Sequence, residues 1–122
     1  MKKYLLILIA FVIVSCEGSD TYQGKWKAMD LKKAKFDIVF SPKSFSITDS
    51  IGKTKSYEYN QNSFAIESSK ATYGITLEDG RAYKIYFPTS DREVGLIFDE
   101  NENQLFSISR KAYINYEDIY KL

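Results

Sequence analysis

The sequence predicts an all-β fold, a small antiparallel up-and-down barrel of about eight strands with a short helix after the last strand. Apolar and polar side chains alternate with a period of two along segments that recur roughly every eight to twelve residues. Clusters of Gly, Asn, Asp, Ser or Pro separate these segments, and no long helical pattern interrupts them. Neighbouring segments should therefore pair antiparallel through short turns.

Residues 1–15 have the features of a signal peptide. Met1-Lys2-Lys3 is basic, and the apolar run from Tyr4 to Val14 is shorter than the roughly 20 residues that span a bilayer. A small residue, Ser15, then precedes Cys16, the only cysteine of the chain.

The stretch Ile13-Val14-Ser15-Cys16 resembles the lipobox of bacterial lipoproteins. The resemblance implies cleavage before Cys16, a diacylglyceryl thioether on its sulfur and acylation of the new N-terminus. It places the protein in the bacterial cell envelope, and Glu17 after the cysteine suggests the outer membrane. The alternative is a secretory signal whose cysteine stays a free thiol, a liability in an oxidising compartment.

The remaining chain is expected to contain one domain. Removing Lys2 and Lys3 from the 17 basic residues leaves 15 basic against 16 acidic side chains, a net charge near −1 that argues against nucleic acid as a partner. Residues 16–21 would then hold the lipidated cysteine and a short linker, and residues 22–122 the barrel domain. Because the linker is short, the domain should sit close to the membrane.

Nine extended segments are predicted in this domain. They are residues 22–28, 35–40, 44–49, 54–59, 63–68, 71–77, 81–87, 94–98 and 105–110. The face expected to point inward carries Phe36, Ile38, Phe40, Tyr57, Tyr59, Phe64, Ile66, Tyr73, Ile75, Leu77, Tyr83, Ile85, Phe87, Val94, Leu96, Phe98, Phe106 and Ile108. The opposite face is largely polar, and closing the sheet into a barrel would bury the apolar face and remove the sheet edges.

The last dozen residues change period. Tyr113, Tyr116 and Tyr120 are spaced three and four residues apart, and Asn115 precedes an acidic first turn, which favours a short helix packed outside the barrel. The alternative is a final strand through residues 112–116.

Trp26 and Arg110 are expected to meet where the barrel closes. Trp26 lies on the first segment after Gly24-Lys25, and Arg110 shares the inward face of the last segment. A closed barrel brings these segments together, so the guanidinium could lie over the indole, a cation–π contact of about 0.5 to 2 kcal/mol. The alternative is that Trp26 is an ordinary core aromatic residue.

With this pattern the chain resembles small bacterial lipoproteins with a lipocalin-like barrel, in which a Gly-x-Trp motif opens the barrel and a basic residue on the last strand packs on that tryptophan. The resemblance implies structural roles for Gly24, Trp26 and Arg110 and a catalytic role for none of them.

The composition argues against an enzyme. The chain has no histidine, and lipid would consume its only thiol, so nucleophile–histidine catalysis and histidine-based zinc sites are not available. Asp99 to Asn103 begins like a calcium loop, but Gln104 replaces the required glycine and Arg110 the required glutamate. No cofactor and no metal are therefore expected.

The sequence leaves open the role of an accessory subunit in an envelope complex, together with two binding functions. In one, the protein binds an envelope protein, as an inhibitor, immunity or exclusion factor would, through outward apolar residues such as Tyr86 and Ile97 on consecutive strands. In the other, the lumen carries a small apolar ligand, with Tyr57, Tyr59, Tyr73, Tyr83 and Phe87 as candidate lining residues. These bulky side chains should nearly fill a barrel of about eight strands, which favours the protein partner. Cover by the C-terminal helix is the alternative explanation for Tyr86 and Ile97.

Overall fold

The computed structural model describes residues 17–119. The predicted signal peptide, Cys16, and the helical positions expected for Tyr120 and Lys121 lie outside the described residues.

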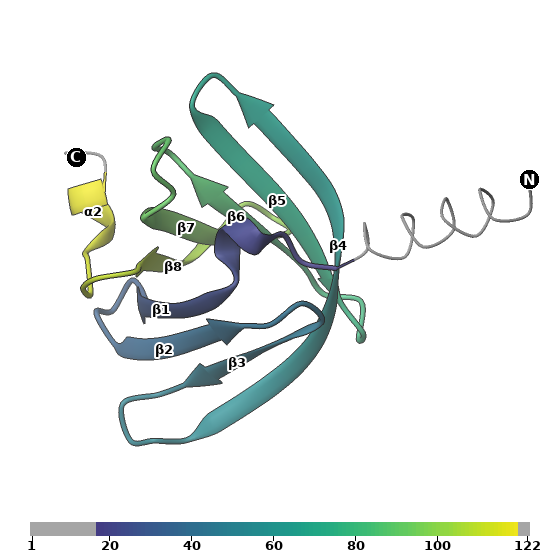
Figure 1. The fold of residues 1–122 in the computed structure, drawn as a ribbon. Coiled ribbons are helices and arrows are strands. Elements are labelled where there is room, and N and C mark those ends of the chain that lie inside the picture. The colour runs from purple at the N-terminus through teal and green to yellow at the C-terminus, as the bar shows by residue number, and fades with distance from the viewer. Residues whose placement is uncertain (1–16, 120–122) are drawn as a thin grey trace, which may run out of the picture.

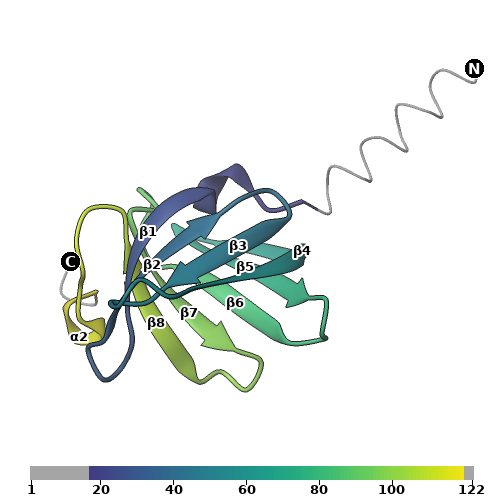
Figure 2. The ribbon, with the colours of Figure 1, turned by 90° about the horizontal axis from the view of Figure 1, so that it is seen from below.

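The described chain forms a closed antiparallel barrel of eight strands, each paired with the next and the last paired with the first. Figure 1 looks into this barrel, and Figure 2 shows it from below. The elements are η1 (Asp20–Tyr22), β1 (Gly24–Met29), β2 (Lys35–Phe40), β3 (Ser44–Thr48), β4 (Thr54–Glu67), β5 (Lys70–Leu77), β6 (Ala82–Phe87), β7 (Val94–Asp99), β8 (Gln104–Ser109) and α2 (Tyr116–Ile119). The predicted fold class, including the short C-terminal helix, is confirmed.

Two predicted strands are one. Residues 54–59 and 63–67 belong to β4, whose first part pairs with β3 and whose second part pairs with β5. Asn60-Gln61-Asn62 resembles a turn in sequence, but the chain continues through a register shift between Gln61 and Ser63, where the extra residue bulges. The side chain of Asn62 donates a hydrogen bond to Thr76 on β5.

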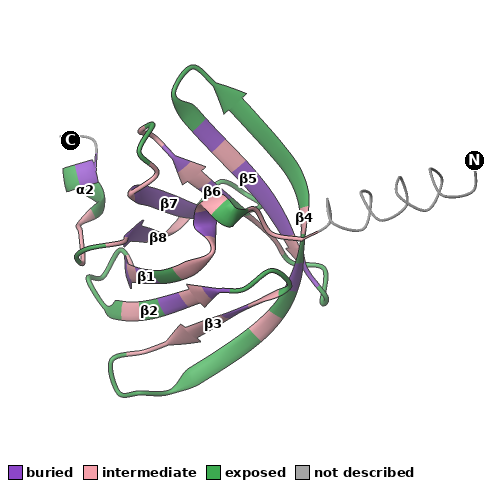
Figure 3. Cartoon of the chain, viewed as in Figure 1, coloured by how far each residue is buried: buried purple, intermediate pink, exposed green. Residues whose placement is uncertain are grey.

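The second half of β4 and the start of β5 form a long hairpin that projects from the barrel wall, and most of its outer half is exposed (Figures 1 and 3). Phe64 and Ile66 lie here and are 52% and 59% exposed. The prediction that both point into a buried core is therefore wrong. β4 extends well beyond its last pair with β3, and nothing in the described chain covers this part of its inner face.

The inner face of the barrel carries the main core. Its largest fully buried side chains include Tyr22, Trp26, Ile38, Ile85 and Phe87. A smaller cluster lies on the outer face of β7, where Val94 and Leu96 pack with Ile119 of α2. The helix is thus held by a second apolar contact area, which agrees with its predicted position outside the barrel.

The face predicted for β7 is wrong. Ile97 points into the main core, whereas Val94, Leu96 and Phe98 belong to the outer cluster. The sequence Val94-Gly95-Leu96-Ile97-Phe98 is apolar on both faces, so its period cannot tell which face is inside. The C-terminal segment explains why both faces are apolar, since it covers the outer one.

The barrel has two unlike ends. At the first, here called the plugged end, lie η1, the turns at residues 41–43, 68–69 and 88–93, and Arg110. At the second, here called the open end, lie the turns at residues 30–34, 49–53, 78–81 and 100–103.

The four turns of the open end share one backbone plan. In each, the N–H of the first residue donates to the carbonyl of the fifth, at 2.8 to 3.1 Å, and the fourth residue has a positive φ. In three of them the first residue is an aspartate whose Oδ1 accepts from the N–H groups of the third and fifth residues; these are Asp30, Asp49 and Asp99. The loop that begins at Asp99 is therefore an aspartate-stabilised hairpin turn.

The positive φ predicts a stabilising substitution. The fourth residue is Gly52 or Gly80 in two turns but Lys33 (φ 68°) and Glu102 (φ 65°) in the others. The left-handed conformation costs an L-residue about 1–2 kcal/mol, and a glycine at that position removes this cost. Glycine loses more chain entropy on folding, which offsets part of the gain in stability. Lys33→Gly and Glu102→Gly should each raise the free energy of unfolding by about 0.5 kcal/mol, measured by urea denaturation.

The matched control is Lys32→Gly, because the backbone of Lys32 has no positive φ. It should destabilise the protein slightly. If Lys33→Gly and Lys32→Gly change stability in the same direction, turn strain is not the cause.

Candidate functional site

Arg110 closes the plugged end by contacting three residues on β1 and η1. Its Cζ lies 3.7 Å from the centroid of the Trp26 ring, so the predicted cation–π contact is confirmed. Nη1 donates to the carbonyl of Lys25 at 3.0 Å, and Nη2 donates to the carbonyl of Thr21 at 3.2 Å. Partial burial lowers the pKa of the guanidinium, which nevertheless stays charged at any physiological pH.

Gly24 permits this closure. Its φ of 95° lies in the region that disfavours L side chains, and an added Cβ would lie 3.2 Å from Nη1 of Arg110. The structural grouping of Gly24, Trp26 and Arg110 predicted from the sequence is thus found in one place.

Tyr22 forms the plug itself. The sequence placed it on the first strand, but it ends η1, a turn capped by Ser19, whose Oγ accepts from the N–H of Thr21. The Tyr22 carbonyl accepts from Nε1 of Trp26 at 2.9 Å, and its hydroxyl donates to Oε1 of Gln61 at 2.7 Å. Burial raises the pKa of the Tyr22 hydroxyl well above its ordinary value. Ser19 before Asp-Thr-Tyr was the sequence signal for this turn.

Three of the predicted lumen residues, Tyr59, Tyr73 and Phe87, lie near this plug and pack among aromatic rings. The ring centroids of Tyr73 and Tyr22 are 5.2 Å apart, and those of Phe87 and Trp26 are 5.7 Å apart. Tyr59 donates its hydroxyl proton to the Ser41 carbonyl at 2.6 Å, and burial raises its pKa. This half of the lumen is filled by aromatic rings.

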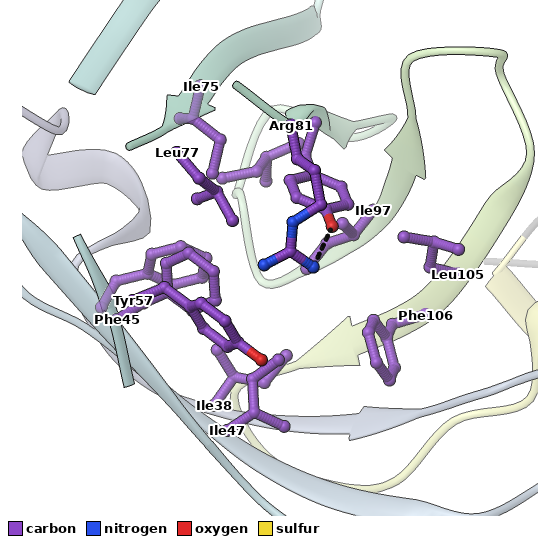
Figure 4. Close-up of a pocket in the computed structure, with 13 residues that line it drawn as sticks. Ile38, Phe45, Ile47, Tyr57, Ile75, Leu77, Arg81, Ile97, Leu105 and Phe106 are labelled. Carbon is purple, nitrogen blue, oxygen red and sulfur yellow. Dashed lines mark hydrogen bonds between the residues drawn. The ribbon is translucent and has the colours of Figure 1, made fainter. Parts of the chain in front are cut away.

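The other two predicted lumen residues, Tyr57 and Tyr83, line a cavity at the open end (Figure 4). Its volume is about 100 Å³, and its other walls are mainly aliphatic and phenylalanine side chains. The residues packed against the core but only partly buried are Phe36, Ile47, Tyr57, Tyr83 and Phe106, all at the open-end part of their strands. The apolar interior is therefore accessible here and sealed at the plugged end.

Arg81 lies at the mouth of this cavity, a position that sequence reasoning did not single out. Its guanidinium carbon is 5.2 Å from the centroid of the Tyr57 ring, and Nη1 donates to the Tyr83 hydroxyl at 3.4 Å (Figure 4). Nε and Nη2 each lie 2.8 Å from Oδ2 of Asp79. This hydrogen bonding lowers the pKa of Asp79 and raises that of Arg81.

The Arg81 contacts can be displaced at small cost. Both partners of the Arg81–Asp79 pair are about half exposed, and exposed ion pairs contribute roughly 0–1 kcal/mol. The guanidinium can thus move aside for an apolar group or donate to a polar atom beside it.

Two exposed apolar side chains flank the open end. Ile51, in the turn between β3 and β4, is 84% exposed, and Leu31, in the turn between β1 and β2, is 63% exposed. The sequence does not mark either residue as a binding candidate, because turn patterns indicate backbone conformation and not the contacts of the side chains.

The predicted partner patch of Tyr86 and Ile97 does not exist. Tyr86 lies opposite Leu96 and packs against the outer cluster, whereas Ile97 lies opposite Ile85 and points into the core. The two side chains are on opposite faces of the sheet because the phase of β7 is reversed. Cover by the C-terminal segment, the alternative considered for Tyr86, accounts for its position.

Within residues 17–119, no group of three or more histidine, cysteine or acidic side chains could hold a metal ion. None of the helices in this part of the chain has the length and apolarity needed to cross a bilayer.

Comparison of the chain with protein-family models gives no match, and comparison with curated proteins gives none either.

Replacing Arg110 tests its role in closure. Arg110→Lys keeps the charge but loses the planar fork that reaches two carbonyls and stacks on Trp26, so we expect a loss of about 1–3 kcal/mol in the free energy of unfolding. Urea denaturation followed by Trp26 fluorescence measures it.

The neighbouring Lys111→Ala is the control, because Lys111 is exposed and should change stability by less than about 0.5 kcal/mol. Equal stability of Arg110→Lys and Lys111→Ala would show that the guanidinium does not hold the barrel closed.

Proposed function

We propose that this protein is a lipid-anchored, non-catalytic envelope lipoprotein that binds a protein partner through the open end of its barrel. The observation that carries the proposal is the cavity below Arg81, which is apolar, open to solvent and small. At about 100 Å³ it is well below the roughly 300–1,000 Å³ of pockets that enclose a drug-sized ligand. One apolar side chain of a partner fits this volume better than a whole lipid does.

The surroundings of the cavity support a protein as the occupant. Ile51 and Leu31 add exposed apolar area to the same end, and Arg81 offers hydrogen-bond donors beside the mouth. Interfaces of this kind often combine a buried apolar anchor with arginine and aromatic residues at the centre. An inhibitor, immunity or exclusion factor would act in this way, by stoichiometric binding and without catalysis.

The alternative is a lipocalin-like carrier of a small apolar ligand in the lumen. The apolar lining of the cavity favours it, and the filling of the other half of the lumen by Tyr22, Tyr73 and Phe87 weighs against it.

Anchoring is proposed through Cys16, on the lipobox resemblance of residues 13–16. Cys16→Ser should give an uncleaved precursor that lacks the diacylglyceryl group, seen as a mass difference by intact-protein mass spectrometry. Ser15→Thr, a conservative change before the cysteine, is the control and should still be lipidated. If the Cys16→Ser protein is processed and fractionates with membranes as before, the anchoring proposal is wrong.

Binding at the open end is tested with the double variant Leu31→Asp/Ile51→Asp. Both residues are exposed, so melting should be nearly unchanged, while the loss of two apolar contacts worth about 2 kcal/mol or more would weaken a complex roughly 30-fold. The tagged full-length protein is purified from envelope membranes, and the partner recovered with each variant is quantified.

Phe64→Ser/Ile66→Ser is the matched control, since it removes two exposed apolar side chains at the opposite end. It should recover the partner as the wild type does. Equal recovery by all three proteins would contradict binding through the open end. A small apolar molecule found in stoichiometric amount by native mass spectrometry would favour the carrier.

A further inference from the structure

The chain enters the barrel at the plugged end, directly after Cys16. The N–H of Gly18 donates to the carbonyl of Pro42 at 2.8 Å, which fixes residue 18 beside the turn between β2 and β3. Only Glu17 lies between Gly18 and Cys16, and two residue steps reach at most about 7 Å at 3.6 Å per residue. A lipid on Cys16 would therefore hold the plugged end against the bilayer.

Phe64 and Ile66 form an exposed apolar strip at this same end. Phe64 and Ile66 pair with Tyr73 and Ala71 on β5, which point into the main core, so the strip continues the inner face of the barrel beyond the plug. The Phe64 ring stacks on Tyr73 at 4.9 Å between centroids, which holds it in place although half of it is exposed. In Figure 1, which looks into the barrel with η1 across it, this hairpin spreads outward.

The two strands that carry and flank the strip, β4 and β5, are tied to the N-terminal segment by direct hydrogen bonds. Oε1 of Gln61 accepts from the N–H of Ser19 at 2.9 Å and from the hydroxyl of Tyr22 at 2.7 Å. The Tyr73 hydroxyl donates to Oγ1 of Thr21 at 3.1 Å. The strip and residues 19–22 therefore keep a fixed relative position.

We infer that Phe64 and Ile66 dock on the surface of the bilayer to which Cys16 is anchored, with the open end turned toward the aqueous phase. This inference rests on the proposed lipid anchor. Apolar side chains of interfacial segments enter the boundary between headgroups and acyl chains, about 5–10 Å deep, where the remaining backbone groups can still bond to water.

The contact should be apolar rather than electrostatic. The charged side chains near this end include both signs: Glu17, Lys43, Glu67, Lys70, Asp91 and Arg92. Because no single sign dominates, neutral and anionic bilayers should serve equally.

A second copy of the chain is the rival occupant. In the described structure the outer half of β4 pairs only with β5, so its other edge is open to another strand. The short tether favours the bilayer, because it holds the strip at the membrane at all times.

Fluorescence quenching tests the orientation. The lipidated full-length protein is reconstituted into phosphatidylcholine vesicles with or without doxyl-labelled lipid, as the variants Phe64→Trp, Ile66→Trp and Ile51→Trp. Trp26 is buried in every variant and supplies the baseline, and Ile51 lies at the open end as the matched control. We expect roughly twofold quenching at positions 64 and 66 and only the wild-type level at position 51, in neutral and anionic vesicles alike.

Flotation of the same vesicles separates this inference from the proposed function. If the protein floats but positions 64 and 66 are quenched no more than position 51, anchoring stands and the docked strip is wrong. The strip belongs to a second copy if, in addition, chemical cross-linking gives dimers that Phe64→Ser/Ile66→Ser abolishes. If the wild type does not float, the anchor fails and the inference falls with it.

Discussion

The contact between Arg110 and Trp26 determines how the rest of this barrel is organised. An eight-stranded sheet closes only if its first and last strands meet, and β1 and β8 share only three residue pairs. One guanidinium extends this short seam by stacking on the indole and bonding to the carbonyls of Lys25 and Thr21. It thereby joins β8, β1 and η1, and the aromatic rings of Tyr22, Tyr73 and Phe87 pack behind it.

The plugged end and the open end differ in how the lumen is filled. At the plugged end, the Tyr22 hydroxyl and Gln61 are hydrogen-bonded to each other, and the rings of Tyr22 and Tyr73 pack edge to face. At the open end the apolar interior meets solvent below Arg81, whose partners are themselves exposed. The same lumen is thus a packed core over half its length and a small apolar cavity open to solvent over the rest.

The sequence predicts the architecture well because alternation and turn residues are local signals. It also predicts the Trp26–Arg110 contact. The only tryptophan lies on the first strand, a basic inward residue ends the last predicted strand, and closing the barrel brings these two strands together. It does not predict the phase of β7, because both faces are apolar and the choice depends on where Ile119 packs. Phe64 and Ile66 alternate like buried residues, and only the unequal lengths of β3 and β4 expose them. No sequence pattern around Arg81 indicates that its side chain lies over a cavity.

The bond from Arg110 to the Thr21 carbonyl spans 89 positions in the sequence. The pairing of β1 with β8 likewise joins the first and last strands, so a chain that lacks either strand cannot complete the barrel. The barrel can therefore close only after nearly the whole chain has left the ribosome. Until then the strand edges of β1 and β8 stay open, which makes the incomplete barrel a natural client for a chaperone.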